Sequence, residues 1–391
     1  MSESGKRRAE SSTPRGIGGR GQPPIYVAES QATGAVPALD SLAAWLRERW
    51  DLVVLVVLAI APLVVPALGG ALGGQVTTLF IYCILALGLN VMVGYTGLVH
   101  LGIASFFGIG AYLLAILTAP MYPFQIGFLA ATIVSVLATA GIGLALGAPT
   151  LRLRGDYLAI VTLGFGEVVK VTLRNLEQIT GGMKGLNPVP PPGAGVKIGS
   201  LDLGLAFAID PRWFYYLTLL LLVGVVVAMR RLEQSRLGRA WVAVREDELA
   251  ASAMGISATR VKLSAFAMSS AVAGLAGCLY AASLSTTADP NAYDFNRSIM
   301  VLCAVILGGL GSIPGTILGV AILVGFDTVL APWADSLIQQ LNINPSGSSL
   351  LSFSGWRLAV FGLALVLVMR FRPEGLVPSR RLAAELHEEH P

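Results

Sequence analysis

Hydrophobic residues in this chain are gathered into long runs that are separated by short polar segments. A helix that crosses the hydrocarbon core of a bilayer needs about 20 mainly apolar residues, whereas a spanning strand needs about ten that alternate. The runs are continuous, so they favour helices. The pattern predicts an all-α polytopic membrane protein with about eight to ten membrane-spanning helices, some broken or re-entrant, at Leu52–Leu68, Val76–Val93, Ile103–Ala119, Ile126–Ala148, Tyr157–Leu173, Trp213–Met229, Leu263–Leu284, Ile299–Leu310, Thr316–Leu330 and Trp356–Met369.

The composition also indicates that much of the chain is surrounded by membrane lipid. Of its 391 residues 54% are hydrophobic, and the mean hydropathy is +0.72. The 45 glycines fit this environment, because small residues let membrane helices approach each other closely. All three cysteines, Cys83, Cys278 and Cys303, lie inside apolar runs, which argues against a disulfide framework.

Sequence motifs for enzyme chemistry are missing. The chain contains no Walker A, HExxH or GxSxG pattern. The C-terminal HEEH sequence holds two of the three histidines, and we interpret it as part of a solvated tail. We therefore predict no catalytic residue, no metal site and no cofactor bound directly by this chain.

Lysine and arginine indicate the orientation in the membrane, because cytoplasmic loops carry an excess of both. If the N-terminus is cytoplasmic, 20 of the 27 lie on the cytoplasmic side, and the C-terminus is cytoplasmic too. The predicted divisions are a disordered basic cytoplasmic tail 1–50, a transmembrane domain 51–372 and a cytoplasmic C-terminal tail 373–391. The transmembrane domain includes a cytoplasmic loop 230–262 and a long external loop 174–212. The external loop either docks a partner or covers the protein's own surface.

Two glycine-rich segments interrupt the apolar runs, one in each half of the chain. Irregular backbone at membrane depth must line a cavity or be buried in protein, so such segments point to a transport pathway. Close helix packing through small residues is the alternative, and each pair of flanking runs forms either a full or a re-entrant hairpin. The candidate gate residues are Gly94, Gly97, His100 and Gly102 in the first segment, and Gly308, Gly309, Gly311 and Gly315 in the second.

Four polar residues lie within predicted spans: Asn90, Glu167, Lys170 and Asp327. Glu167 lies ten residues into its run, about 15 Å along a helix and therefore near the bilayer centre. Lys170 follows at i+3 and can pair with it. Such groups are costly in a membrane and mark functional sites, although a structural pair between helices is the alternative.

A charged segment between two apolar runs, Arg245 to Gly255, predicts a short cytoplasmic helix of about nine residues. The acidic residues Glu246, Asp247 and Glu248 suit its N-terminus, and Gly255 suits its end. Leu249, Ala253 and Ile256 form a narrow apolar stripe, and Ala250, Ala251 and Ala253 give a small-residue surface that a partner groove could seat. An ordinary charged loop is the alternative.

Several blocks, in order, resemble one known family over about Leu52 to Pro378. Together they are similar to the LivM-type permease subunit of branched-chain amino-acid ABC importers, within the high-affinity branched-chain, urea and amide permease family. The blocks are GYTGLVHLGIASFFGIGAY, GDYLAIVTLGFGEVVKVTLRN, TGGMKGL, SRLGRAWVAVREDELAASAMGI, LGGLGSIPG and MRFRPEGLVP.

The resemblance implies a subunit of the bacterial plasma (inner) membrane that imports branched-chain amino acids. Its implied partners are a second homologous permease, two cytoplasmic ATPase subunits that bind ATP and Mg²⁺, and an extracytoplasmic substrate-binding protein; no nucleic acid is expected. It also implies that the segment from Arg245 to Gly255 is the helix that couples the permease to the ATPase.

The match departs from the family pattern at two places. In the coupling pattern E-A-A-x-x-x-G, Ala250, Ala251 and Gly255 are kept, but Leu249 takes the acidic position. Where LivM-type sequences often read S-L-G-H, this chain has His100 and Ile103 at the outer positions. Urea or a short amide is an alternative substrate, and an ion-coupled secondary transporter that uses Glu167, Lys170 and Asp327 is an alternative from another class.

Overall fold

The computed structural model describes most of the chain after residue 70. The predicted span Leu52–Leu68, the tail 1–50 and nearly all of the C-terminal tail lie outside the described residues. Those described fall within one compact unit, Val56–Pro391, and comprise 71–123, 125–150, 156–193, 197–198, 201–202, 210–287, 289–340, 353–372 and 375–377.

Two long helices form the centre of the fold. They are α3, Ala71–Asn90, which continues as the π-helix η2, Val91–Tyr95, and α12, Ala258–Leu284. About 83% of the apolar window of the first and 72% of that of the second are buried, whereas each outer helix buries less than half. These two helices pack against each other, and α12 also packs along α4, Ile103–Thr118; small residues allow the close approach.

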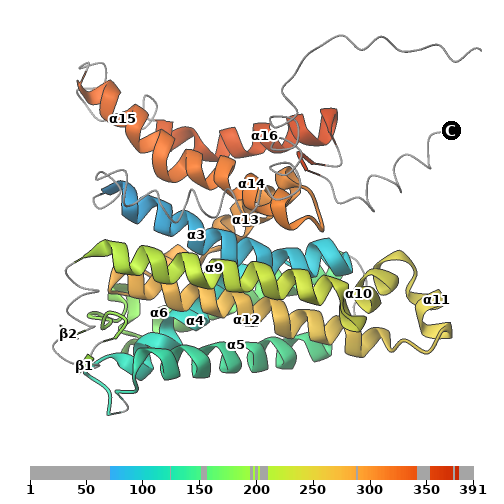
Figure 1. Cartoon of the computed structure of the whole chain (residues 1–391), viewed down its shortest axis with the longest axis horizontal. Coiled ribbons are helices and arrows are strands. Elements are labelled where there is room, and N and C mark those ends of the chain that lie inside the picture. Colours follow the sequence, from blue (N-terminus) through green and yellow to red (C-terminus); the bar gives the residue numbers. More distant parts are fainter. Residues whose placement is uncertain are drawn as a thin grey trace, which may run out of the picture. The chain divides into compact units, whose positions relative to one another are not determined.

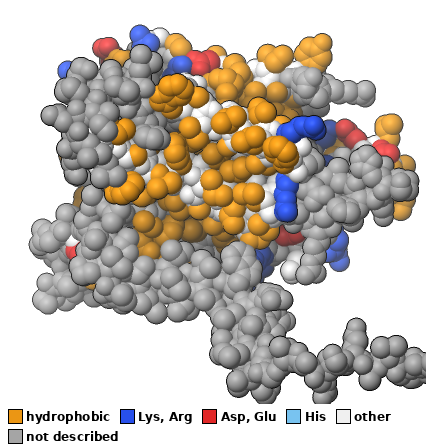
Figure 2. Space-filling view, turned by 90° about the horizontal axis from the view of Figure 1, so that it is seen from above, with side chains coloured by type: hydrophobic (Ala, Val, Ile, Leu, Met, Phe, Trp, Pro, Cys, Tyr) orange, Lys and Arg blue, Asp and Glu red, His pale blue; other side chains and the backbone are white. Residues whose placement is uncertain are grey.

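Helices α5, Phe128–Thr150, and α9, Pro211–Gln234, flank this centre (Figure 1). Only 28% and 33% of their apolar windows are buried, so most of their apolar side chains lie on the outside. Figure 2 shows an apolar field on the face that is seen from above the view of Figure 1, with Lys and Arg gathered toward its edge. A field of this size belongs in lipid rather than in water.

The second glycine-rich segment joins a helical hairpin. Helix α13, Phe295–Gly308, runs into α14, Ile313–Gly325, which continues through the π-helix η5, Phe326–Leu330, into α15. Helix α16 packs on α13. The remaining bounds here are Pro290–Tyr293 for the 3-10 helix η4, Ala331–Gln340 for α15, Phe353–Trp356 for the 3-10 helix η7 and Arg357–Phe371 for α16.

Helix α6, Asp156–Asn175, packs on α4, η4 and α13 and leads into a loop that folds back on the protein. Leu186 and Val189 of this loop are buried, and their backbones bond to the turn at Ser285–Thr287. The part of this loop from 176 to 193 therefore covers the protein's own surface. It contains α7, Glu177–Thr180, and the 3-10 helix η3, Gly182–Lys184. The short strands β1, Lys197–Ile198, and β2, Leu201–Asp202, follow it in the chain and pair antiparallel.

At the other end of α9 the chain makes a charged corner of two helices, α10, Arg236–Glu246, and α11, Glu248–Ala253. All predicted runs within the described residues fall on helices, which confirms the all-α membrane fold. Within the described part of the chain, five helices are long and apolar enough to cross a membrane. With 16 and 14 residues, α4 and α13 reach only about 24 Å and 21 Å, shorter than the ~30 Å hydrocarbon core.

Candidate functional site

The two glycine-rich segments, far apart in sequence, meet in one junction. The side-chain oxygen of Asn90, at the end of α3, accepts a hydrogen bond of 2.9 Å from the backbone N–H of Gly311. Asn90 is 1% exposed, so it satisfies a buried donor that would otherwise be costly. A Cβ on Gly94 would lie 2.5 Å from the Gly311 nitrogen, so only glycine fits there. We name Asn90, Gly94 and Gly311 the glycine junction.

The α13–α14 hairpin beside the junction is also built on close backbone contact. A Cβ on Gly315 would meet the backbone of Gly308, and Gly309 and Gly311 have φ of +121° and +73°, which favour glycine. The backbone N–H groups of Leu376 and Val377 donate to the carbonyls of Leu307 and Gly308. The C-terminal GLV sequence thus satisfies carbonyl groups at the end of α13. Sequence reasoning did not find this role.

Arg245, the last basic residue of α10, reaches the glycine junction. Its guanidinium Nη1 donates to the carbonyl oxygen of Gly94 at 2.5 Å, and its Cγ lies beside Gly97, which has φ +67°. Next to this contact Tyr95 stacks on Trp241 of α10, with ring centroids 6.3 Å apart. The charged corner is therefore fixed directly to the end of the first broken helix.

The predicted coupling helix is only partly correct. Asp247 is its N-cap and accepts from the N–H groups of Leu249 and Ala250, so the helix begins at Glu248 and has six residues instead of about nine. Glu246 was wrongly placed at its start, because it ends α10 together with Arg245. A sharp break at Asp247, extended at φ −151°, separates the two helices.

The apolar stripe predicted for this helix is not its buried face. Leu249 is 81% exposed and Ala253 is exposed, whereas Ala251 is buried against Val244 and Ala258. Ala250 and Ala253 remain on the outer surface. The helix ends at Ala253 with Met254 as its C-cap, and Gly255 follows with φ +84°, as expected for a glycine stop.

A salt bridge anchors α11 to the core of the fold. Lys262, in the second turn of α12, lies 2.6 Å from the Glu248 carboxylate. Trp241 is fully buried and donates from its indole nitrogen to the Ser264 hydroxyl at 2.9 Å. Because α12 is a central helix, these contacts join α10 and α11 to the middle of the bundle.

His100 and Gly102 lie in the segment between η2 and α4, against α6. The His100 ring is 2% exposed and lies between Phe106 and Phe266, with centroids 5.6 Å and 5.7 Å away. Burial lowers the pKa of His100 to about 4, so the ring is neutral near pH 7. The backbone of Gly102 packs against that of Thr162. These positions pack helices together; their role as gate residues stays a prediction.

The other predicted polar residues are separated in space. Glu167 and Lys170 pair within α6 at 2.6 Å, as predicted, with 42% and 22% of their side chains exposed. Asp327 lies in η5 and lines a pocket together with Arg297 of α13. The sequence offered no signal that Arg297 and Asp327 share a cavity.

Long apolar helices that enclose glycine-built reversals and charged side chains define a multi-pass membrane protein of the transporter class. Residues 71–369 match the family described as "Branched-chain amino acid transport system / permease component". The chain therefore belongs to this permease family.

Named relatives agree with this assignment. The chain is 38% identical over 361 residues to the high-affinity branched-chain amino acid transport system permease protein LivM of Escherichia coli, covering 88% of this chain and 78% of that protein. It is 37% identical over 360 residues to LivM of Salmonella typhimurium, with the same coverage. It is 26% identical to BraD of Pseudomonas aeruginosa over 76% of this chain and 91% of that protein. No solved structure matches significantly.

Proposed function

We propose that this chain is the permease subunit of a bacterial ABC importer that carries branched-chain amino acids across the plasma membrane. In this proposal a second homologous permease completes the pathway, two cytoplasmic ATPase subunits supply energy, and an extracytoplasmic binding protein delivers substrate. Family membership supports the substrate class. The similarity to the permease LivH of Salmonella typhimurium, 25% identical over 62% of this chain and 79% of that protein, supports a related second subunit.

The observation that carries the proposal is the bond from Arg245 to Gly94. It joins an exposed charged corner to a glycine junction where both broken segments meet. A partner that moves this corner would move the ends of α3 and η2 directly. An ATPase can bias the permease only if it contacts the two permease states differently, and this corner supplies the place for such contact.

The surface of the charged corner formed by α10 and α11 is suited to binding a partner protein. Leu249 and Met254 are 81% and 84% exposed, and the alanines at positions 250 and 253 leave space around them. The corner is also rich in Lys and Arg, which places it on the cytoplasmic side in our proposal. Both termini are then cytoplasmic, and the loop at 176–193 is external.

The decisive experiment is purification of the tagged chain from its native membrane in mild detergent, followed by mass spectrometry and transport assays. We expect a Walker A ATPase and a second glycine-rich permease to stay bound. The complex in proteoliposomes should then import labelled leucine only with ATP and the binding protein.

The main alternative is an ion-coupled secondary transporter. A chain that purifies alone in several detergents, and that drives uptake in proteoliposomes with an ion gradient and no ATP, would establish that alternative. Import of urea by the complex without import of leucine would move the substrate to the amide branch of the family.

A further inference from the structure

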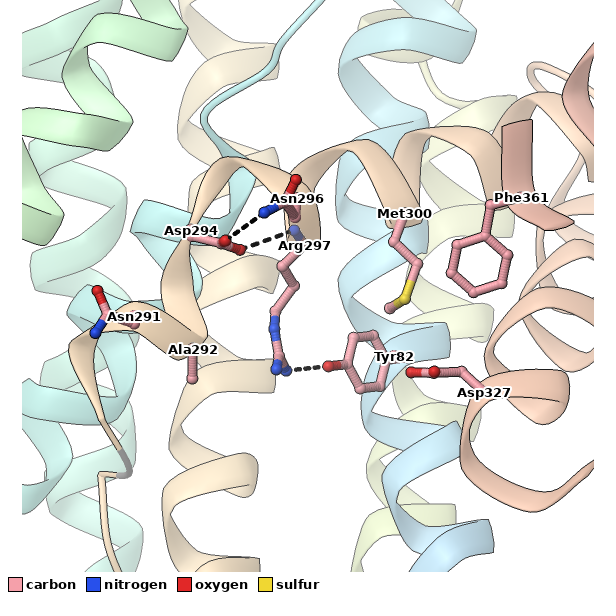
Figure 3. Close-up of a pocket in the computed structure, with 9 residues that line it drawn as sticks. All are labelled: Tyr82, Asn291, Ala292, Asp294, Asn296, Arg297, Met300, Asp327 and Phe361. Carbon is pink, nitrogen blue, oxygen red and sulfur yellow. Dashed lines mark hydrogen bonds between the residues drawn. The ribbon is translucent and has the colours of Figure 1, made fainter. Parts of the chain in front are cut away.

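A polar pocket lies at the opposite end of α13 from the glycine junction. Its volume is about 220 Å³, and its walls include Tyr82, Asp294, Arg297, Met300, Asp327 and Phe361 (Figure 3). Sites for drug-sized ligands are larger, roughly 300–1,000 Å³, so this pocket suits a small solute. Its walls come from α3, α13, η5 and α16, elements that are distant in sequence.

Arg297 supplies the positive charge of the pocket. Its guanidinium donates to the Tyr82 hydroxyl and lies 5.4 Å from the ring centroids of both Tyr82 and Tyr280. Aromatic faces attract a cation without neutralising it. A guanidinium has five N–H donors in a planar fork that matches a carboxylate, so Arg297 is held in place with donors left for an anion.

Asp327 supplies the negative charge. It lies in the π-helix η5, and π-helical turns inside longer helices are frequent at functional sites. Figure 3 shows the Arg297 guanidinium and the Asp327 carboxylate directed toward Tyr82 from opposite sides. Two charges of opposite sign therefore face one small cavity within membrane-crossing elements, where ionisable groups are costly and usually functional.

One part of the pocket wall is apolar, beside the polar residues Asn291 and Asn296. Met300 is one turn further along α13 than Arg297 and is 8% exposed, and Phe361 of α16 is 4% exposed. A flexible thioether and an aromatic ring accommodate a branched aliphatic group well. The pocket thus combines a cation, the Asp327 carboxylate and an apolar surface. The second carboxylate in its wall, Asp294, caps α13 by accepting a hydrogen bond from the backbone N–H of Arg297.

We propose that this pocket binds the zwitterion of an aliphatic α-amino acid during transport. The α-carboxylate pairs with Arg297, the α-ammonium pairs with Asp327, and the side chain lies against Met300 and Phe361. The inference rests on the proposed import function and adds a selective site within the permease itself. A neutral amide or urea carries neither the carboxylate nor the ammonium group that this pair of side chains recognises, so the pocket selects against it.

The location connects the pocket to the glycine junction. Arg297 lies in the first turn of α13 and Gly308 at its end, about 17 Å away at 1.5 Å per residue. Tyr82 and Asn90 lie on the same helix, α3, and Asp327 follows α14, which starts beside Gly311. Movement at the junction therefore reaches the pocket through three helices.

The test uses the intact complex in nanodiscs without binding protein, and measures how ligands raise its unfolding temperature. Leucine should raise it, whereas leucinamide, which lacks the carboxylate, and 4-methylpentanoate, which lacks the ammonium group, should not. Arg297→Gln should abolish the response to leucine, as should Asp327→Asn. The control substitutions Arg174→Gln and Asp335→Asn, outside the pocket, should keep it.

The variant Met300→Phe keeps every charge of the pocket, so it tests the site even if the charge variants misfold. It should shift the ligand preference of the complex from leucine toward alanine, because the larger side chain fills space at the apolar wall. If folded Arg297→Gln and Asp327→Asn complexes respond to leucine like the wild type, the pocket is not the site. If those complexes also import leucine normally with ATP and binding protein, only this inference fails. A wild-type complex that imports no leucine at all would instead overturn the proposed function.

Discussion

Arg245 and Gly94 are separated by 151 positions, yet the guanidinium of one donates to the backbone carbonyl of the other at 2.5 Å. The bond fixes the charged corner of α10 and α11 to the end of the first broken helix. It also lies one contact away from Gly311, because Asn90 and Gly94 both touch that residue. This relationship gives a route for mechanical coupling that can be tested directly.

Arg245→Gln removes the charge that bonds Gly94. A hydrogen bond from a charged group contributes about 1.5–3 kcal/mol, so we expect leucine import to fall by about tenfold or more. ATP hydrolysis should persist and lose its dependence on substrate. The exposed Arg239, whose guanidinium donates to the nearby Gln234 carbonyl at 2.7 Å, provides the matched control Arg239→Gln. Unchanged import in Arg245→Gln would exclude this bond from coupling.

Gly94→Ala inserts a methyl group between the Asn90 side chain and the Gly311 backbone. Such overpacking costs about 1–3 kcal/mol or more, and we expect a lower unfolding temperature together with loss of import. Gly141→Ala in α5 is the control, because its Cβ would meet nothing within 4 Å. The unfolding temperatures of the two variants can be measured by fluorescence-detected gel filtration after heating. Equal behaviour of the two variants would show that the junction is not tightly packed.

The Glu167–Lys170 pair distinguishes the importer from an ion-coupled transporter. The pair is local to α6 and partly exposed, and such pairs contribute only about 0–1 kcal/mol. Removing both charges with Glu167→Gln and Lys170→Gln together should therefore leave most of the ATP-driven leucine import. Either single change leaves one charge without its partner and should be more harmful. Complete loss of import in the double variant would instead favour a role in ion translocation.

His100 gives the chain a pH-dependent contribution to stability. Its pKa is about 4 in the folded protein and about 6.5 when unfolded, so the unfolded state binds more protons between these values. The contribution of the neutral ring is fully present above pH 6.5 and is lost as the pH falls toward 4. We expect the unfolding temperature of His100→Gln to fall less than that of the wild type between pH 7 and 5. Parallel curves would indicate that the ring is hydrated.

The sequence by itself determined the membrane class, the positions of the helices and several local features. A continuous apolar run longer than 15 residues is stable in lipid as a helix, because a helix forms all hydrogen bonds of its backbone N–H and C=O groups within the segment. The i+3 spacing of Glu167 and Lys170 was sufficient for their pairing, because neighbours on one helix face meet whatever the tertiary fold is. Gly255 as a helix stop was equally local.

Tertiary structure decided which distant residues share a site. Nothing in the order of residues places Gly94 beside Gly311, Arg245 on Gly94, or Arg297 across a cavity from Asp327. The start of α11 was also misjudged, because the extended backbone at Asp247 separates α10 from α11. Small residues permit many close helix pairs, and only the packing of all helices at once selects one of them.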